Sequence, residues 1–546
     1  MSGVSTESVE PGGPRAGFAR KASGLVRDFS QLDAWIYNVL AINIVLNVAL
    51  SYALVAVTYP HASIWLALVL AGIFCTFEAI VYAIFTTAMP RSGGDYVFQS
   101  RVLGGGVATM FAFTAVTLSQ IIWMALAGWF GANLILSPFL TLLGGVYNWG
   151  WAVDAGEWFA KDIGVFTMGI VSIVWASFVN VRGLRVYAYW QRYFFWVGMA
   201  CLAIVTVAML FSSNADFQNN LNHFMSTNYG VSNAYDKVIQ QGGTTNVSFS
   251  LGQTLLATVI ASFALIYPAW SVQQAGEIKR ASSLKGNVRS IVGAEVFSFI
   301  VVAIVGALLY DRVGQEFLYA AGTTYYEGGE SVLPVAPFFG FFAALVSTSP
   351  IFVWISFVMF FAWYWMWFPN IMVGGTRVVL AMSFDKILPA WFGKVDRHTH
   401  SPVNATIAMA IASLVMVALY SFVEAFLALT LGLLVLNITG FAATMVAGAV
   451  FPWKRRDMYR ATPAARHTVF GIPLISIAAV IFLAFVVFVD IQALRADELG
   501  INGTKGLLLV GGTYVVAALI YIGSKVYRRR RENLDLSLVY RELPSE

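Results

Sequence analysis

The chain has 546 residues, of which 59% are hydrophobic and only 11% are charged, whereas an average soluble protein has about 25% charged residues. Together with a mean hydropathy of +0.73, this composition excludes an ordinary soluble enzyme and predicts a polytopic α-helical membrane protein. Both cysteines, Cys75 and Cys201, fall in apolar runs, so we expect no disulfide framework and no metal site of paired cysteines. Segment 1–30 has no apolar core, and we expect no cleavable signal peptide.

Apolar windows long enough to cross about 30 Å of hydrocarbon predict about twelve membrane spans. They lie near residues 32–57, 63–89, 105–137, 161–180, 188–211, 249–275, 291–311, 341–376, 404–421, 424–450, 471–491 and 505–526. The windows are continuous rather than alternating, which excludes a transmembrane β-barrel. Tails are expected at 1–31 and 528–546.

The basic residues predict which ends of the spans face the cytoplasm, because cytoplasmic loops hold the excess of Lys and Arg. Of the 33 such residues, only five fall on the opposite side: Lys161, Lys237, Arg312, Arg495 and Lys505. Both termini are therefore predicted to be cytoplasmic, with the protein in the cell (plasma) membrane. The polar segments 212–248 and 313–340 are expected to cover the outer mouth. The arginine run 528–531 indicates contact with anionic lipid rather than with nucleic acid.

Several polar or aromatic side chains within the spans can serve either packing or binding. Asn43, Asn47 and Ser51 form one stripe on the first span. The stripe either bonds a neighbouring helix, at about 0.6 to 2 kcal/mol per contact, or faces a cavity of substrate size. Gln120 on the third span leaves the same two possibilities. The run WYWMW from Trp363 on the eighth span is more typical of packing than of recognition.

The sixth span reads SFALIYPAWSVQQAGEIKR from Ser262, which places Pro268 in the middle of the bilayer. A proline there removes one backbone hydrogen bond and clashes with the preceding turn. Broken helices at membrane depth mark binding sites in transporters, so we expect Phe263, Tyr267 and Pro268 to contact a small zwitterion. The alternative is a structural kink alone.

Glu78 lies about halfway along the second span, where a charge costs roughly 2.5 to 3.5 kcal/mol. Either it carries a coupling proton, or it makes a structural hydrogen bond. Glu295 is expected within about one turn of the cytoplasmic edge, in reach of water. The histidines show no metal-ligand spacing and the chain has no P-loop, so no cofactor or metal is expected beyond a coupling ion, H⁺ or Na⁺.

The segment MPRSGGDYVFQSRVLG from Met89 resembles the Pro-x-Ser-Gly-Gly-x-Tyr signature of amino acid-polyamine-organocation permeases. Three further segments agree in order: VNVRGLR from Val179, GEIKR from Gly276 and TRVVLAMSFDKILP from Thr376. The resemblance implies an all-α fold of the LeuT type, with a five-plus-five inverted repeat and substrate held between broken first and sixth helices. The implied repeats are 32–211 and 249–450, joined by an extracellular loop at 212–248 and followed by two spans at 451–527.

By matching position, the resemblance implies a cytoplasmic gate of Arg91, Asp95, Glu277 and Arg377. The positive-inside rule is the other explanation for these charges. The chain also departs from the family's pattern at two places that bear on the substrate.

The family's Gly-Ser-Gly in the unwound first span has its place here at Ile44, Val45 and Leu46. By that place, these three residues are expected to contact the substrate, although without glycine they do not form the family's usual α-carboxylate site. The Gly-Phe pair usual in the sixth span is replaced by Tyr267 and Pro268, which predicts a bulkier or differently shaped pocket.

The predicted function is a secondary active transporter of amino acids or related small solutes, working by alternating access and either proton-coupled or an exchanger. Two alternatives stay open: a sensor that binds such a ligand without turnover, and a polyamine or nucleobase permease. A channel is disfavoured because no charged pore ring is present, and an enzyme because no catalytic cluster is. The expected partners are a small-molecule substrate and the lipid bilayer. The outer loops hold no cysteine, so no disulfide-linked heavy subunit is expected.

Overall fold

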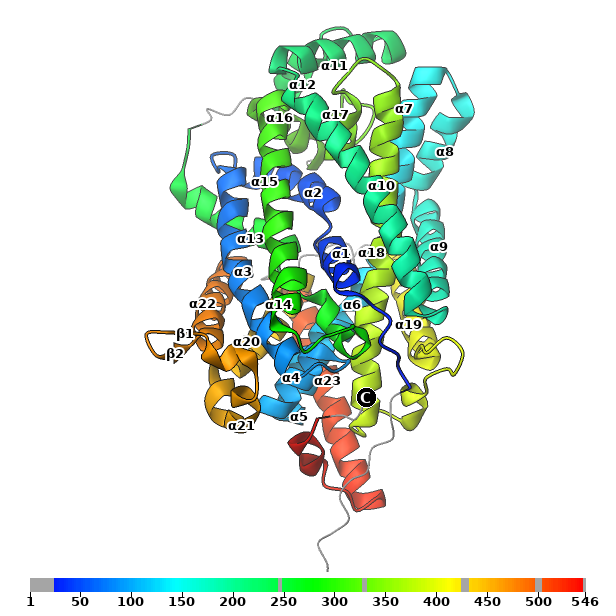
Figure 1. The fold of residues 1–546 in the computed structure, drawn as a ribbon. Helices are drawn as coiled ribbons and strands as arrows, with labels where there is room; N and C mark the ends of the chain where they lie inside the picture. Colours follow the sequence, from blue (N-terminus) through cyan, green and yellow to red (C-terminus); the bar gives the residue numbers. More distant parts are fainter. Residues whose placement is uncertain (1–23, 244–247, 327–330, 424–431, 496–502, 544–546) are drawn as a thin grey trace, which may run out of the picture.

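The computed structural model describes residues 24–243, 248–326, 331–423, 432–495 and 503–543, which form an elongated bundle of helices (Figure 1). Eleven helical segments within these ranges are long and apolar enough to cross a membrane, and a further apolar helix, α13, is shorter. The predicted all-α membrane protein with about twelve spans is confirmed.

Most spans consist of a single helix. These are α3 (Ile64–Ala88), α9 (Asp162–Val181), α10 (Leu184–Leu210), α13 (Leu251–Leu265), α18 (Ile351–Phe384), α19 (Val403–Phe422), α20 (Gly432–Lys454), α22 (Leu474–Arg495) and α23 (Thr504–Arg531). The first, third and seventh spans are built from shorter pieces. They are α1 (Gln31–Ile42) with α2 (Ile44–Thr58); α5 (Gly105–Phe113), α6 (Ser119–Trp129) and α7 (Ser137–Tyr147); and α14 (Leu284–Asn287) with α15 (Gly293–Val313). π-Helical turns join the pieces of the third and seventh spans.

Shorter elements cover both ends of the bundle (Figure 1). The upper end carries α8 (Gly150–Ala160), α11 (Asn214–Tyr229), α12 (Ala234–Gly242), α16 (Gln315–Tyr326) and α17 (Phe339–Ala344). The lower end carries α4 (Gly94–Val102), α21 (Arg456–Arg460) and an antiparallel hairpin of β1 (Thr468–Val469) and β2 (Ile472–Pro473). The 3₁₀ segment Leu536–Arg541 also lies at the lower end.

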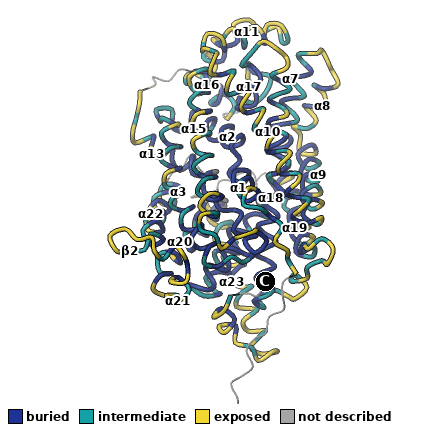
Figure 2. Tube along the Cα trace, viewed as in Figure 1, coloured by how far each residue is buried: buried dark blue, intermediate teal, exposed yellow. Residues whose placement is uncertain are grey.

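The first span begins at a defined cap and occupies the centre of the bundle. The Ser30 hydroxyl accepts from the Asp33 N–H at 3.1 Å while the Asp33 carboxylate accepts from the Ser30 N–H at 3.0 Å, which satisfies two of the free donors at a helix start. In the most apolar stretch of this span 89% of residues are buried, against 11% in the last span. Figure 2 shows buried residues in the interior of the bundle and exposed residues at its two ends.

Several predicted span boundaries are wrong: the third span runs to Tyr147 and the seventh begins at Leu284, beyond the predicted limits of 137 and 291. The span predicted at 249–275 is helical only to Leu265, because Pro268 follows. The span predicted at 341–376 starts at Ile351 and runs to Phe384, because the turn-forming segment 347–350 separates it from α17. In that turn the Ser347 hydroxyl accepts from the Ser349 N–H at 3.3 Å, a local bond that competes with helix. The start of the span predicted at 424–450 lies outside the described residues.

Candidate functional site

The first span is interrupted at a single residue, Asn43. Its φ of 52° is left-handed, a conformation that asparagine tolerates better than most residues. The Asn43 N–H closes α1 by donating to the Val39 carbonyl at 3.0 Å. The Asn43 side chain then opens α2 by accepting from the Leu46 N–H at 3.3 Å. The last carbonyls of α1 and the first N–H groups of α2 therefore fall outside a continuous helical ladder.

Ile44, Val45 and Leu46, which take the place of the family's unwound segment, are helical in this chain. All three residues are buried in the first turn of α2. One left-handed residue is enough to break the helix when its own side chain caps the next one, so the interruption is shorter than a glycine-rich loop and lies one residue earlier. The predicted discontinuity of the first helix itself is present.

The interruption of the sixth span is longer. The last helical bond runs from the Ile266 N–H to the Ser262 carbonyl at 3.1 Å, and Tyr267 and Pro268 follow in non-helical conformation. Beyond them the chain forms only 3₁₀ turns, Trp270–Gln273 and Ala275–Glu277. Non-helical backbone at this depth requires protein partners.

Asn38 of α1 supplies one such partner. Its side-chain oxygen accepts from the Ser271 N–H at 2.8 Å, and its amide donates to the Ser290 carbonyl at 2.8 Å. The segment after the break in the sixth span is therefore bonded directly to the first span and, through Asn38, to the seventh.

Asn370 of α18 joins the same centre. Its backbone carbonyl accepts from the Tyr37 hydroxyl at 2.7 Å and from the Trp270 indole at 3.2 Å, and its amide donates to the Tyr37 carbonyl at 2.8 Å. The first, sixth and eighth spans thus meet at one residue of α18.

A proline also lies inside α18. Pro369 has no N–H, so the carbonyl of Trp365, four residues earlier, loses its helical partner. The Trp175 indole of α9 donates to that carbonyl at 2.8 Å. The proline is therefore accommodated by a side chain from a neighbouring helix.

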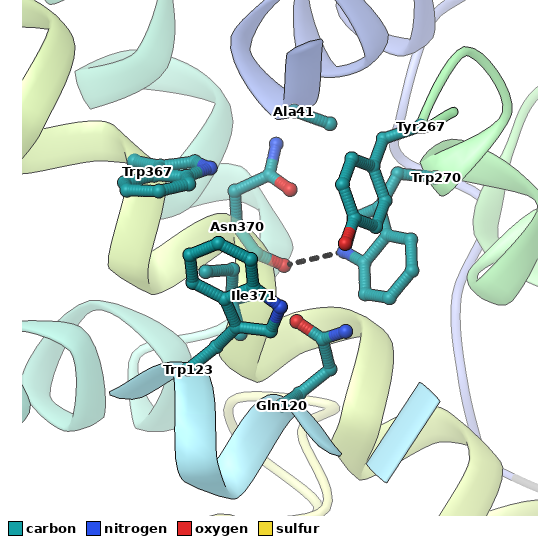
Figure 3. Close-up of a pocket in the computed structure, with 8 residues that line it drawn as sticks. All are labelled: Ala41, Gln120, Trp123, Tyr267, Trp270, Trp367, Asn370 and Ile371. Carbon is teal, nitrogen blue, oxygen red and sulfur yellow. Dashed lines mark hydrogen bonds between the residues drawn. The ribbon is translucent and has the colours of Figure 1, made fainter. Parts of the chain in front are cut away.

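A small cavity lies where these spans meet (Figure 3). Its volume, measured as the space open to the centres of water-sized molecules, is about 20 Å³, which holds about one water. It is lined by Ala41, Gln120, Trp123, Tyr267, Trp270, Trp367, Asn370 and Ile371. None of these side chains is charged. The Trp123 N–H, the Tyr267 hydroxyl and the Asn370 side-chain oxygen make no hydrogen bond of normal geometry with the described residues, so polar groups border an otherwise apolar space, as in ligand pockets.

Only part of the predicted substrate set lines this cavity. Gln120 and Tyr267 do, and Phe263 packs behind Trp123 with ring centroids 5.2 Å apart. The Gln120 amide also donates to the Asn437 side-chain oxygen of α20 at 3.0 Å, so it serves both packing and lining. Pro268 provides the break itself.

Asn43 and Asn47 are buried but are not among the residues that line the cavity. Within the stripe, the Ser51 hydroxyl donates to the Asn47 side-chain oxygen at 2.8 Å. The amide nitrogens of both asparagines have no hydrogen-bond partner among the described residues. The residues of the predicted stripe are therefore buried but do not line the cavity.

Six lining residues were not among the predicted site residues: Ala41, Trp123, Trp270, Trp367, Asn370 and Ile371. Trp367 belongs to the aromatic run of the eighth span that the sequence assigned mainly to packing. Trp270 follows Pro268 by two residues, and that proximity is the signal that could have selected it.

The residues predicted as a cytoplasmic gate lie at the lower end. Arg377 of α18 and Glu277 form a buried, bidentate ion pair at 2.8 and 3.0 Å, which joins the end of the sixth span to the eighth. Arg91 is half-buried and donates to the Pro90 carbonyl at 3.1 Å.

Asp95 of α4 is a hydrogen-bond acceptor at the junction of three elements. Its carboxylate accepts from the Tyr82 hydroxyl at 2.6 Å, the Gln273 amide at 2.6 Å and the Thr444 hydroxyl at 2.5 Å. Burial raises the pKa of the Asp95 carboxyl, while these three bonds oppose the rise. Asp95 therefore links α3, the sixth span and α20 by hydrogen bonds.

A second buried ion pair was missed. Arg101 of α4 and Asp385 bind each other through two contacts of 2.5 and 3.0 Å. The Arg101 guanidinium also donates to the Glu542 carbonyl at 3.2 Å and lies 5.8 Å from the Tyr540 ring centroid. Arg455 donates to the Tyr540 carbonyl at 2.8 Å. The last described segment is thus anchored on this pair.

Two carboxyl groups lie inside the bundle. Glu78 of α3 is 1% exposed and Glu295 of α15 is 0% exposed. The expectation that Glu295 reaches water is wrong, because the seventh span begins at Leu284 and eleven residues of helix, about 16 Å, separate that start from Glu295. None of the four carboxyl oxygens has a hydrogen-bond partner among the described residues.

The bundle is that of a polytopic membrane protein with a small cavity between two interrupted helices. The chain matches the family model of amino acid permeases over residues 32–503 and belongs to this family. It is therefore a membrane transporter of the amino acid permease family, as the four sequence segments indicated. Comparison with the curated proteins finds no match.

Proposed function

We propose that the protein is a secondary active transporter that carries amino acids or related small organic solutes by alternating access. The observation that carries this proposal is the position of the cavity at both helix breaks. Ala41 lies two residues before Asn43, and Tyr267 and Trp270 flank Pro268. Interrupted helices near the bilayer midplane are where transporters of several folds bind their substrates.

The lining of the cavity supports a solute with an ammonium group. Because no charged side chain lines it, the charges of the solute would meet ring faces and dipoles. A cation within about 6 Å of an indole ring is attracted to its face, and Trp123, Trp270 and Trp367 offer three such rings. The amides of Gln120 and Asn370 supply hydrogen bonds. An amino acid fits this set, and a polyamine is the nearest alternative.

The proposal includes the orientation and internal symmetry of the chain. Both termini are cytoplasmic, in a cell (plasma) membrane, so the Arg377–Glu277 pair closes the cytoplasmic side of the cavity. Segments 32–211 and 249–450 are inverted repeats of five spans each. The proposed repeat is supported by the two interrupted helices, because each is the first span of its segment.

Coupling is assigned to a proton on Glu78, with solute exchange as the alternative mode. A carboxyl group without hydrogen-bond partners at membrane depth is costly when ionised and is therefore suited to bind a proton. Replacing Glu78 by Gln should abolish the dependence of uptake on a pH gradient. Unchanged pH-driven uptake in liposomes would contradict the assignment.

A ligand screen tests the proposed function directly. The purified protein is heated with single amino acids, polyamines and nucleobases, because a ligand at 100 times its Kd stabilises the folded state by about 2.7 kcal/mol. The best ligand is then radiolabelled and its accumulation in proteoliposomes is measured. We expect stabilisation by an amino acid or amine, followed by accumulation. Stabilisation without accumulation would favour a sensor, and stabilisation by a nucleobase alone would overturn the solute class.

Matched variants connect the ligand to the cavity. Trp367→Phe changes a lining residue, whereas Trp365→Phe changes a neighbour in the same helix that does not line it. The first should weaken the ligand-induced stabilisation and the second should leave it near the wild-type value. Equal effects would place the ligand elsewhere.

A further inference from the structure

Glu78 and Glu295 lie on two adjacent helices, α3 and α15. α3 and α15 run in opposite directions, and Gly72 of α3 lies against the Phe299 ring of α15, where an added methyl would come within 2.3 Å of the ring. From that contact, Glu78 lies six residues or about 9 Å down α3, and Glu295 four residues or about 6 Å down α15. The two carboxyl groups are therefore at nearly the same level, and their charges interact.

Unpartnered polar atoms gather on these helices and on the first span. All four carboxyl oxygens of Glu78 and Glu295, the Ser298 hydroxyl and the amide nitrogens of Asn43 and Asn47 have no hydrogen-bond partner among the described residues. Buried polar groups are normally paired. So many unpaired donors and acceptors in one region indicate a site that binds something small.

Two hydrogen bonds show that the break in the first span lies close to this level. The Asn38 amide donates to the Ser290 carbonyl at 2.8 Å, and the Tyr52 hydroxyl donates to the Val302 carbonyl at 3.4 Å. The first and seventh spans run in the same direction between these contacts. Asn43 therefore falls between them, at about the height of residue 295.

No positive charge acts on the two carboxyl groups. In the described part of the chain neither group forms an ion pair, and no lysine, arginine or histidine interacts electrostatically with either. α13, which packs against α3, holds no titratable residue. The titratable groups that interact with the pair are Cys75 and Tyr82 of α3, Asp95 of α4 and Tyr267 of the sixth span.

We propose that Glu78 and Glu295 form one proton-binding site, in which the two carboxyl groups share a single proton, and that Glu295 is a coupling residue together with Glu78. The proposal rests on the proposed transport function for its role in coupling. Two adjacent carboxylates in a medium of low dielectric cannot both ionise at modest cost. One proton held by the pair removes one of the two charges, with no cation needed.

Loss of that proton would change the contact between α3 and α15. Two bare carboxylates repel each other and attract unpaired N–H donors, such as the Asn43 and Asn47 amides of the first span. The charge on Glu78 also acts on Tyr267, which lines the cavity. The state of the pair is thereby linked to both interrupted helices.

Infrared spectroscopy of the purified protein tests the shared proton without a transport assay. The C=O stretch of a protonated carboxyl group is recorded for the wild type, Glu78→Gln, Glu295→Gln and the double variant. Asp490→Asn, which removes another largely buried acid on α22, is the matched control. We expect either single substitution to remove the same band and the control to retain it. A band that survives in the double variant would overturn the proposal.

Proteoliposomes test the role in coupling. Glu295→Gln should lose accumulation driven by a pH gradient more severely than it loses exchange at equal pH, which requires no net proton movement. Full pH-driven accumulation by Glu295→Gln, or accumulation driven by Na⁺ instead of pH, would overturn the coupling role. If the wild type shows the predicted infrared band but no pH-driven uptake, the shared-proton site stands and the proposed proton coupling is wrong.

Discussion

Replacement of Asn43 examines whether the break in the first span is needed for binding. Asn43→Ala loses the side-chain cap of α2, which is worth about 1 kcal/mol, and holds a Cβ residue in the left-handed region at a cost of about 1 to 2 kcal/mol. Asn43→Gly also loses the cap, but glycine adopts positive φ without that cost. Because both lose the cap, the two variants should differ by about 1 to 2 kcal/mol in the stability of the broken conformation.

This difference predicts the affinities. A shift of about 2 kcal/mol changes a population roughly 30-fold, and the apparent affinity falls with the fraction of molecules that can bind. Asn43→Ala should thus bind the best ligand of the thermal screen up to roughly 30-fold more weakly than Asn43→Gly. Calorimetric titration measures both affinities, and the melting temperature without ligand reports on folding.

Two results would refute the reasoning. Wild-type affinity in Asn43→Ala would mean that the break is not needed. Equal losses in the alanine and glycine variants would mean that the asparagine side chain itself is required, rather than the backbone conformation that it stabilises.

Three further changes test buried contacts near the cytoplasmic gate, in the eighth span and at the C-terminal segment. Glu277→Gln leaves the Arg377 guanidinium buried without its charge partner and should cost about 3 to 5 kcal/mol, seen as a large drop in melting temperature; an unchanged value would contradict the buried pair. Trp175→Phe leaves the Trp365 carbonyl unpaired and should cost about 1 to 3 kcal/mol by the same measurement. Tyr540→Ala should release the C-terminal segment, so that limited proteolysis removes it faster than in the wild type, whereas an equal rate would show that Tyr540 does not anchor it.

Helix breaks and turns that are caused by one residue or a short segment could be predicted from the sequence. Pro268 has no N–H wherever it lies, so the break in the sixth span followed from one residue. The exact residue of the break in the first span could not be read from the sequence, because the left-handed conformation of Asn43 depends on a cap that its own side chain provides. The turn before Ile351 is marked in the sequence by segment 347–350, which consists of hydroxyl residues and a proline. Averaging hydropathy over a long window hides this short segment.

The site was harder to predict because it depends on how helices are rotated and stacked. Trp123, Trp270 and Trp367 are three of 17 tryptophans, and only their helix positions select them for the cavity. Glu295 was assigned to the water boundary because its depth depends on where the seventh span begins, and a short helix with a π-helical turn precedes α15. Asp385 lies in a recognised segment, but its partner Arg101 is 284 residues away in the chain.

A density map of the purified protein with the best ligand of the thermal screen tests the central claim most directly. We predict ligand density between the break at Asn43 and the break at Tyr267 and Pro268, in contact with Trp270 and Asn370. Ligand density outside this cavity, or a first span that is helical without interruption through residue 43, would contradict the account.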